Sequence, residues 1–142
     1  AVRSHSTSPW PPRSWRSRLP ANVPDSRNVV EMATRVVPIL PTQDAAAAVQ
    51  WYRHYGFEVV FEHRFEPHLP AYVGIKRGDA EIHLSEHTGD IATPGLLYIW
   101  VDAVEPLAAL SGATIDEMPW ARDFEIADPD GNRLRFAEPV AG

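Results

Sequence analysis

The chain has 142 residues, of which 44% are hydrophobic and none is cysteine, and its formal net charge is −6 at pH 7. This length suits one domain with a hydrophobic core, and the lack of cysteine excludes disulfides, thiolate metal sites and a cysteine nucleophile. No apolar run approaches the ~20 residues of a membrane span, and an acidic chain lacks the basic face that nucleic-acid binding requires. We therefore expect a soluble, cytoplasmic protein that binds neither membranes nor nucleic acids.

The first 31 residues differ in composition from the rest. They are rich in Ser, Pro and Arg, carry a net charge of +3 and show no helical or strand periodicity. The sequence predicts that residues 1–31 are disordered or a non-native extension, with Met32 as the natural start, and that residues 32–142 form a single domain. That domain is strongly acidic, which would attract a cationic ligand. On charge alone, however, solubility is a sufficient explanation.

A regular series of elements follows. The pattern predicts a strand over Arg35–Leu40 that contains Pro38, a residue tolerated only at a sheet edge or a bulge. A helix over Ala45–Tyr55 is expected next, capped by Thr42 or Asp44. Alternating apolar and polar residues then predict three strands, over Glu58–Phe65, Ala71–Lys76 and Ala80–Glu86.

The same order of elements repeats in the second half. A strand over Leu96–Val101 precedes a helix from Ala103 to Leu110, capped by Asp102, and three more strands are expected near Thr114–Glu117, Asp123–Ala127 and Arg133–Ala137. The repeat also aligns residues, pairing Ile82 with Leu134, Leu84 with Phe136 and Glu86 with Glu138. The sequence thus predicts an α+β fold of two βαβββ modules, residues 35–88 and 94–138, curled into a cup-shaped mixed sheet. A ferredoxin-like α+β domain is the alternative from secondary structure alone.

The most informative segment is the hairpin at 119–136. Pro129-Asp130-Gly131 predicts a tight turn, because it fixes φ, accepts local hydrogen bonds and allows positive φ. Alternation gives the hairpin one buried and one open face, with Trp120 at its mouth. If the paired apolar residues of the repeat pack under the helices, the residues that point into the cup are Glu81, His83, Ser85, Arg133 and Arg135.

The segment Pro119-Trp120-Ala121-Arg122-Asp123-Phe124 resembles the Pro-Trp-Gly-Arg-Glu-Phe segment of the bleomycin resistance proteins, in the vicinal-oxygen-chelate (glyoxalase-like) superfamily. The stretches 36–40, 56–57 and 97–101 are similar to that family as well. The resemblance covers residues 35–138 and implies the superfamily's fold of two modules forming a cup. It also implies a homodimer that exchanges a strand near Pro38 and forms two identical clefts at its interface.

Superfamily enzymes hold a divalent metal with His or Glu ligands from four strands. The resemblance places those positions at Val37, His83, Leu96 and Arg135, of which only His83 can bind a metal. A catalytic metal needs roughly three protein ligands. We therefore expect no metal, no other cofactor and no catalytic residues, and we expect His83 to form hydrogen bonds in the cleft instead.

The metal-free branch of the family implies a binding protein that sequesters a bleomycin-type glycopeptide by gripping its planar tail between aromatic rings. Each stacking pair adds roughly 0.5–1.5 kcal/mol beyond burial, and a cation over a ring gains further. Glu62, Glu66 and Glu117 are candidates for the acidic groups near the drug's cationic end. The residues that the resemblance assigns to ligand binding are Tyr98 and Trp120 as stacking rings, Phe61 and Phe65 beside them, Ser85 and His83 as polar contacts, and Trp100.

Other interpretations remain open. Phe61, Phe65 and Trp100 can instead fill the cup or pack at a subunit interface. The chain can also be a superfamily enzyme, of lyase or dioxygenase type, acting on a small metabolite, with activity that depends on added metal. Finally, the same scaffold can bind another planar aromatic compound, with Arg135 and His83 reading an anionic group.

Overall fold

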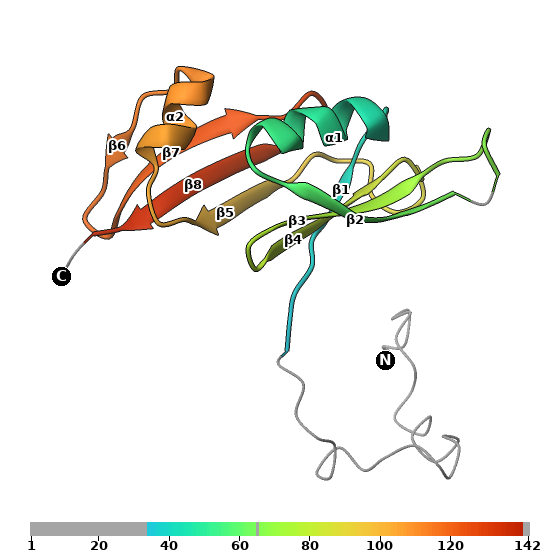
Figure 1. Ribbon diagram of the computed structural model, residues 1–142, viewed down its shortest axis with the longest axis horizontal. Coiled ribbons are helices and arrows are strands. Elements are labelled where there is room, and N and C mark those ends of the chain that lie inside the picture. The colour runs from blue at the N-terminus through green and yellow to red at the C-terminus, as the bar shows by residue number, and fades with distance from the viewer. Residues whose placement is uncertain (1–33, 65, 141–142) are drawn as a thin grey trace, which may run out of the picture. The chain divides into compact units, whose positions relative to one another are not determined.

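The computed structural model describes residues 34–64 and 66–140, and those from Val36 onward belong to one unit of the chain. In this unit two modules follow each other, each with a strand, a helix and three more strands (Figure 1). The first module contains β1 (Ile39–Pro41), α1 (Ala45–His54), β2 (Glu58–His63), β3 (Tyr72–Arg77) and β4 (Ala80–Ser85). The second contains β5 (Leu96–Trp100), α2 (Glu105–Ser111), β6 (Asp116–Glu117), β7 (Ala121–Ala127) and β8 (Arg133–Pro139). The predictions for residues 1–31 and for Phe65 fall outside the described residues.

Each module forms its own four-stranded mixed sheet. The strand order is β1-β4-β3-β2 in the first sheet and β5-β8-β7-β6 in the second. In both sheets the first strand is parallel to the last, and the other neighbours are antiparallel. Both helices lie on the same side of the two sheets (Figure 1). The predicted fold of two βαβββ modules is confirmed, and the ferredoxin-like alternative is wrong because the strands form two sheets rather than one.

Local signals explain several element boundaries. Gly78 joins β3 to β4 with a φ of 57°, and Gly131 occupies the equivalent turn between β7 and β8 with a φ of 86°. Such left-handed φ values favour glycine because it has no Cβ. Asp44 caps α1, since its side chain accepts the backbone N–H of Ala47 at 3.2 Å. The two predicted turns and this cap therefore fix the start of α1 and the register of both hairpins.

Two predicted boundaries are wrong. α2 begins at Glu105, and its N-cap is Val104, which makes no side-chain cap, rather than Asp102. The N–H of Val104 is satisfied instead by the Glu138 carboxylate at 2.8 Å. The first strand is also shorter than expected and starts after Pro38, whose carbonyl accepts the N–H of His83 at 3.0 Å. β1 lies at the edge of its sheet, where a proline is tolerated.

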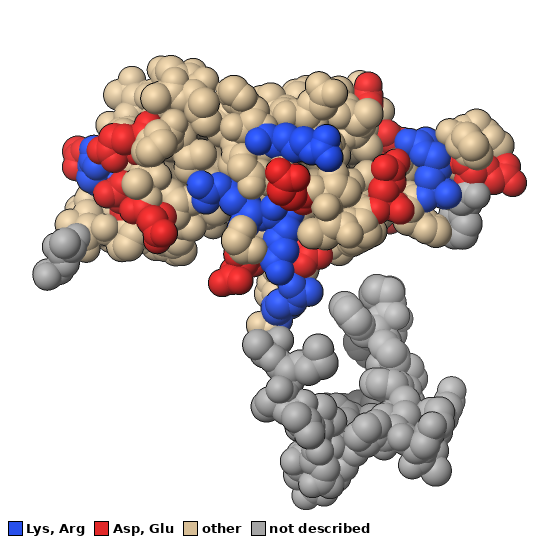
Figure 2. All heavy atoms as spheres, viewed as in Figure 1, with Lys and Arg blue, Asp and Glu red and all other residues tan. Residues whose placement is uncertain are grey.

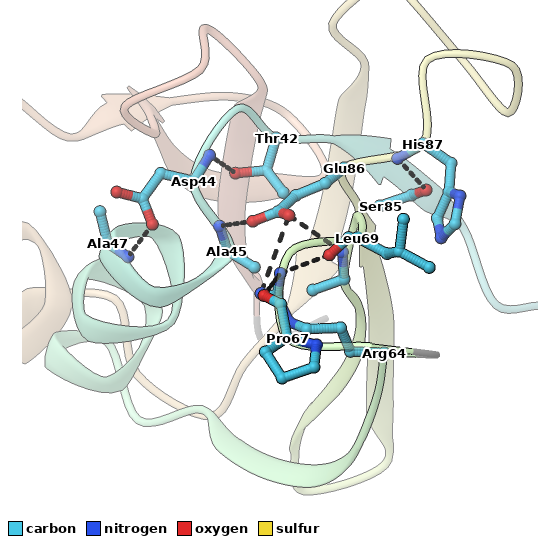
Figure 3. Close-up of polar contacts among 11 residues, drawn as sticks. Thr42, Asp44, Ala45, Ala47, Arg64, Pro67, Leu69, Ser85, Glu86 and His87 are labelled. Atoms are coloured by element: carbon cyan, nitrogen blue, oxygen red, sulfur yellow. Dashed lines mark hydrogen bonds and ion pairs between the residues drawn. The ribbon is translucent and has the colours of Figure 1, made fainter.

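Glu86 and Glu138, which the sequence repeat pairs, support the two helices in the same way. Glu86 accepts the N–H of Ala45 at the start of α1 at 2.8 Å (Figure 3), as Glu138 does for Val104. A carboxylate at a helix N-terminus satisfies a free N–H and interacts favourably with the helix dipole. Glu86 also accepts the N–H of Ala71 at 2.9 Å and lies 3.9 Å from Arg64. The repeat therefore preserves a buttress between the last strand and the helix of each module.

The two modules share one hydrophobic core under the helices. The paired apolar residues Ile82, Leu84, Leu134 and Phe136 are all buried, as alternation predicts. Tyr55 of α1 reaches across to the second module, where its ring stacks 6.3 Å from that of Phe136. The strand alternation predicted from the sequence is confirmed, and it leaves the opposite face of both sheets uncovered by helix.

A buried polar network also joins the modules. The side-chain amide nitrogen of Asn132 donates to the carbonyl of Pro41 and to the Asp128 carboxylate, each at 2.9 Å, and its oxygen accepts the N–H of Gly95 at 2.9 Å. Tyr52 of α1 donates to the same Asp128 carboxylate at 2.7 Å. Because every member is hydrogen-bonded, the network fixes the second module's turn against the first module without leaving a buried polar group unpaired.

Candidate functional site

The face of the two sheets that lies away from α1 and α2, here called the open face, carries an unusual number of exposed aromatic side chains. On the second module Trp120 is 59% exposed, Trp100 56% and Tyr98 41%. The neighbouring apolar residues Leu96 and Met118 are exposed too. Large exposed apolar patches mark interaction sites in soluble proteins.

Tyr98, Trp100 and Trp120, together with Asp123, form the second aromatic cluster. The indole N–H of Trp120 donates to the Tyr98 hydroxyl at 3.3 Å, and that hydroxyl donates to the buried Asp123 carboxylate at 3.3 Å. The Trp100 ring meets the Tyr98 ring edge-on, with centroids 5.2 Å apart. Alternation along β5 places Tyr98 and Trp100 on one face, and the hydrogen bonds bring Trp120 to them from the start of β7. The rings of Tyr98 and Trp120 are thereby held by polar contacts rather than by burial.

A pocket of about 210 Å³ adjoins this cluster, lined by Tyr98, Met118, Trp120, the carboxylates of Asp116, Asp123 and Glu125, and Arg135. Its formal charge is negative, because three carboxylates face one guanidinium. Glu125 pairs with Arg135 at 2.8 Å and with Arg133 at 3.3 Å. The hydrogen bond from Arg135 lowers the pKa of the Glu125 carboxyl below its ordinary value, and Arg133 adds to the effect. Both arginines of the open face are thus offset by a carboxylate.

Phe61, Tyr72 and His83, together with Glu81, form the first aromatic cluster, on the open face of the first module. The rings of Phe61 and Tyr72 stack with centroids 6.1 Å apart, and His83 meets Phe61 edge-on at 5.1 Å. The Nδ1 atom of His83 lies 2.8 Å from the Tyr72 hydroxyl, and its Nε2 atom lies 2.8 Å from Glu81. Both imidazole nitrogens are therefore engaged within the protein.

Gly74 provides the space for the Phe61 ring. A Cβ atom at this position would lie 2.2 Å from Cε1 of Phe61, far inside contact distance. Gly74 is the residue that pairs with both Phe61 and His83 across the sheet. The absence of a side chain at Gly74 is what allows Phe61 to lie flat over the sheet between Tyr72 and His83.

The remaining predicted residues lie elsewhere. Ser85 is buried at the end of β4, where its hydroxyl donates to Asp90 at 2.5 Å and accepts the N–H of His87 (Figure 3). It lines a pocket of about 340 Å³ at the junction of the modules rather than the pocket beside Trp120. None of the acidic residues Glu62, Glu66 and Glu117 lines the pocket beside Trp120; Glu117 pairs instead with Arg122 at 2.8 Å.

Sequence reasoning missed Tyr72, Asp123 and Asp116 as members of these clusters. The alternation that placed His83 on the open face also places Tyr72 there, two residues before Gly74, so that signal was available. The acidic residues carry no comparable signal, because their approach to Tyr98 and Trp120 depends on the pairing of β6, β7 and β8. Acidic side chains also gather over α2 and β6 (Figure 2), where Arg122 pairs with Glu105, Glu117 and Glu138.

Comparison with known proteins identifies the family. The family model of a glyoxalase superfamily protein matches residues 25–142. The chain belongs to the glyoxalase superfamily. No curated protein matches it. Within the described residues, no helix is long and apolar enough to cross a membrane.

Solved structures of similar fold include several binding proteins. A bleomycin-binding protein complexed with bleomycin is 18% identical and aligns with a TM-score of 0.57 over 76% of this chain and 100% of its own. TioX from Micromonospora sp. ML1 is 20% identical, with a TM-score of 0.62 over 76% and 100% of the two chains. TnmS3, an antibiotic binding protein from Streptomyces sp. CB03234, is 22% identical, with a TM-score of 0.59 over 78% and 100%. At these identities the similarity establishes the fold.

The metal positions of glyoxalase superfamily enzymes do not fit a metal here. Val37 and Leu96 have no donor atoms, and the Arg135 guanidinium is a cation paired with Glu125. His83 has both ring nitrogens hydrogen-bonded. Across residues 34–64 and 66–140, no group of three or more His, Cys, Asp or Glu side chains is arranged to hold a metal ion. The residues at these four positions therefore do not fit the superfamily's metal.

Proposed function

We propose that this chain is a non-catalytic binding protein that sequesters a bleomycin-type glycopeptide antibiotic and so confers resistance to it. The observation that carries this proposal is the second aromatic cluster. Tyr98 and Trp120 stand largely exposed beside an acidic pocket, and a chain of hydrogen bonds to Asp123 holds them there. Exposed rings held in place are suited to stack on a flat heteroaromatic ligand, because little side-chain entropy is lost on binding.

The charge of the pocket supports a cationic ligand. Asp116, Asp123 and Glu125 supply three carboxylates, and Arg135, the one cation of the lining, is already bound to Glu125. A cation placed over Trp120 or Tyr98 would gain both from these carboxylates and from the ring faces. Two of the structurally similar proteins are described as a bleomycin-binding protein and an antibiotic binding protein, which accords with this role.

We further propose that the protein acts as a homodimer with strand exchange near Pro38. Within one chain the open face is not covered by any helix, and its exposed rings include Phe61 on the first module and Trp100 on the second. β1 is an edge strand of three residues that follows an exposed Val36. Pairing two copies through their open faces would place the first aromatic cluster of one chain near the second aromatic cluster of the other.

The direct test is calorimetric titration of metal-free bleomycin into the protein. We expect binding of one drug per chain, and we expect Trp120→Ala to weaken it by about tenfold or more, since a stacking ring and its buried area are lost. The free energy of unfolding should change little, because Trp120 is exposed. Leu110→Ala is the matched control, since Leu110 is a similarly exposed apolar residue on α2.

Two results would contradict the proposal. If Trp120→Ala lowers stability as much as it lowers affinity, the ring has a structural role. If no heat of binding is seen at high protein concentration, the ligand is not a bleomycin-type drug, and titration of other planar aromatic compounds into the same two variants becomes the measure of the site. Sedimentation of the free protein tests the dimer separately.

A further inference from the structure

The hydrogen-bond chain of the first aromatic cluster has a defined direction. An ionised Glu81 carboxylate only accepts hydrogen bonds, so Nε2 of His83 is the protonated nitrogen. In the neutral ring Nδ1 is then an acceptor, and the Tyr72 hydroxyl donates to it. His83 has no polar atom left for a ligand. The oxygen of Tyr72, by contrast, keeps lone pairs that can accept a further hydrogen bond.

The surroundings of Tyr72 are negative. Burial and the Asp90 carboxylate raise the pKa of Tyr72 above its ordinary value, so the phenol keeps the proton that it donates to His83. Ser85 donates to the Asp90 carboxylate at 2.5 Å and so holds it beside the cluster. Carboxylates therefore flank the Tyr72–His83 pair from two sides, Asp90 on the loop after β4 and Glu81 at the start of β4. An anionic ligand group would be repelled here.

We propose that Tyr72, positioned by His83, is a ligand contact of the first module and accepts a hydrogen bond from a protonated amine or amidine carried on a planar ring. The ring would lie over the exposed part of Phe61, which stacks in parallel on Tyr72. The inference deepens the proposed function, because it names the chemical group that the first module reads. It also opposes the alternative in which His83 reads an anionic group, since His83 faces Glu81 and Tyr72.

The test uses benzamidine, a planar ring with an amidinium, against benzoate, a similar ring with a carboxylate. Each is titrated into the ¹⁵N-labelled full chain, and amide shifts are followed by NMR. We expect benzamidine to shift amides of β3 and β4 in a saturable way, and benzoate to leave them unmoved. Tyr72→Phe, which removes only the hydroxyl, should weaken benzamidine binding by about tenfold, the range for a hydrogen bond to a charged group.

Tyr98→Phe is the matched control, because it removes the equivalent atom from the second aromatic cluster. It should leave the benzamidine affinity measured on β3 and β4 unchanged. The proposal is overturned if benzamidine does not shift these amides, if benzoate shifts them equally, or if Tyr72→Phe binds like the parent protein.

The positioning role of His83 is tested by rescue. His83→Gln keeps an acceptor for Tyr72 and a donor for Glu81 and should retain most of the affinity, whereas His83→Leu should lose it while thermal unfolding shows both variants folded. Equal affinity in the two variants would remove His83 from the proposal.

Bleomycin titrated in parallel separates the two proposals. Benzamidine binding that depends on Tyr72, without bleomycin binding, would refute the proposed function and support the subsite. The reverse pattern would refute the subsite alone.

Discussion

The two modules share a scaffold and differ on the open face. Buried positions match in kind: Ile82 corresponds to Leu134, and Glu86 supports α1 as Glu138 supports α2. Open-face positions do not match. The first module pairs Gly74 with His83 across the sheet, whereas the second pairs Glu125 with Arg135.

This difference follows the alternation of the strands. Side chains that point under the helices must fit a packed core, where a change of one methylene is felt. Side chains on the other face meet no such constraint and can differ between modules. The result is a neutral cluster built around stacked rings and a histidine in the first module, and a charged pocket beside two indoles in the second. The open face thus offers two chemically distinct contact areas on equivalent strands.

The largest effect is expected where the shared scaffold is unequal. Glu86 accepts two backbone N–H groups, from Ala45 and Ala71, whereas Glu138 accepts the one N–H of Val104. Because each orphaned buried group costs about 1–3 kcal/mol, Glu86→Ala should lower the free energy of unfolding by about 3 kcal/mol and Glu138→Ala by about half as much. Urea unfolding of both variants measures the difference.

Glu58→Ala serves as the control for that pair, since it removes a carboxylate from an exposed position of β2. It should leave the unfolding midpoint close to that of the parent. Equal losses for Glu86→Ala and Glu138→Ala would mean that the two buttresses contribute alike and that the second N–H contact of Glu86 adds nothing.

The sequence predicts this scaffold because its signals are local. Pro129-Asp130-Gly131 marks one turn, alternation separates the two faces, and the Glu86/Glu138 pair is visible in the repeat. The α2 cap fails for the opposite reason, since the N–H of Val104 is satisfied by Glu138, 34 residues away. A cap supplied from another strand leaves no trace near the start of the helix.

The site is less accessible to sequence reasoning, because its contacts cross the sheet. Tyr98 and Trp120 are 22 residues apart and meet through a hydrogen bond at the end of β7. Tyr72 reaches His83 only in the observed register of β3 with β4. Ser85 follows the alternation of His83 but is covered where β4 ends beside Asp90, so the period alone places it wrongly in the open.

A smaller effect is expected at the link between the modules. Burial, and after it the charge of Asp128, raises the pKa of the Tyr52 hydroxyl above its ordinary value. A folded-state pKa above that of the unfolded chain contributes stability below the ordinary tyrosine pKa of about 10, and this contribution is lost as the pH rises above it. Tyr52→Phe should therefore cost about 1 kcal/mol at neutral pH.

The same variant gives a pH test. The stability gap between the parent and Tyr52→Phe should narrow by about 0.8 kcal/mol at about pH 10.5, because only the parent's unfolded state gains from ionising this hydroxyl. Urea unfolding at both pH values measures the gap, and the other tyrosines cancel in the comparison. Parallel stability curves would show that Tyr52 ionises as readily in the folded protein as in the unfolded chain.

The smallest change in stability, and a clear change in binding, is expected at Glu125. Its pairs with Arg133 and Arg135 are exposed, so Glu125→Gln should alter the free energy of unfolding by less than about 0.5 kcal/mol. It would nevertheless remove a carboxylate from the pocket beside Trp120 and release two guanidinium groups. Bleomycin affinity should then fall about fivefold at low salt, and the loss should fade as salt screens the charges.

Glu117→Gln is the charge-matched control, since Glu117 pairs with Arg122 and does not line the pocket. Calorimetry on the two variants at two salt concentrations distinguishes a local effect from one of net charge. If both substitutions weaken binding equally, the acidity of the whole domain attracts the drug. If neither does, the drug's cationic end lies away from the second module, and the negative surroundings of Tyr72 on the first module become the place where that charge is read.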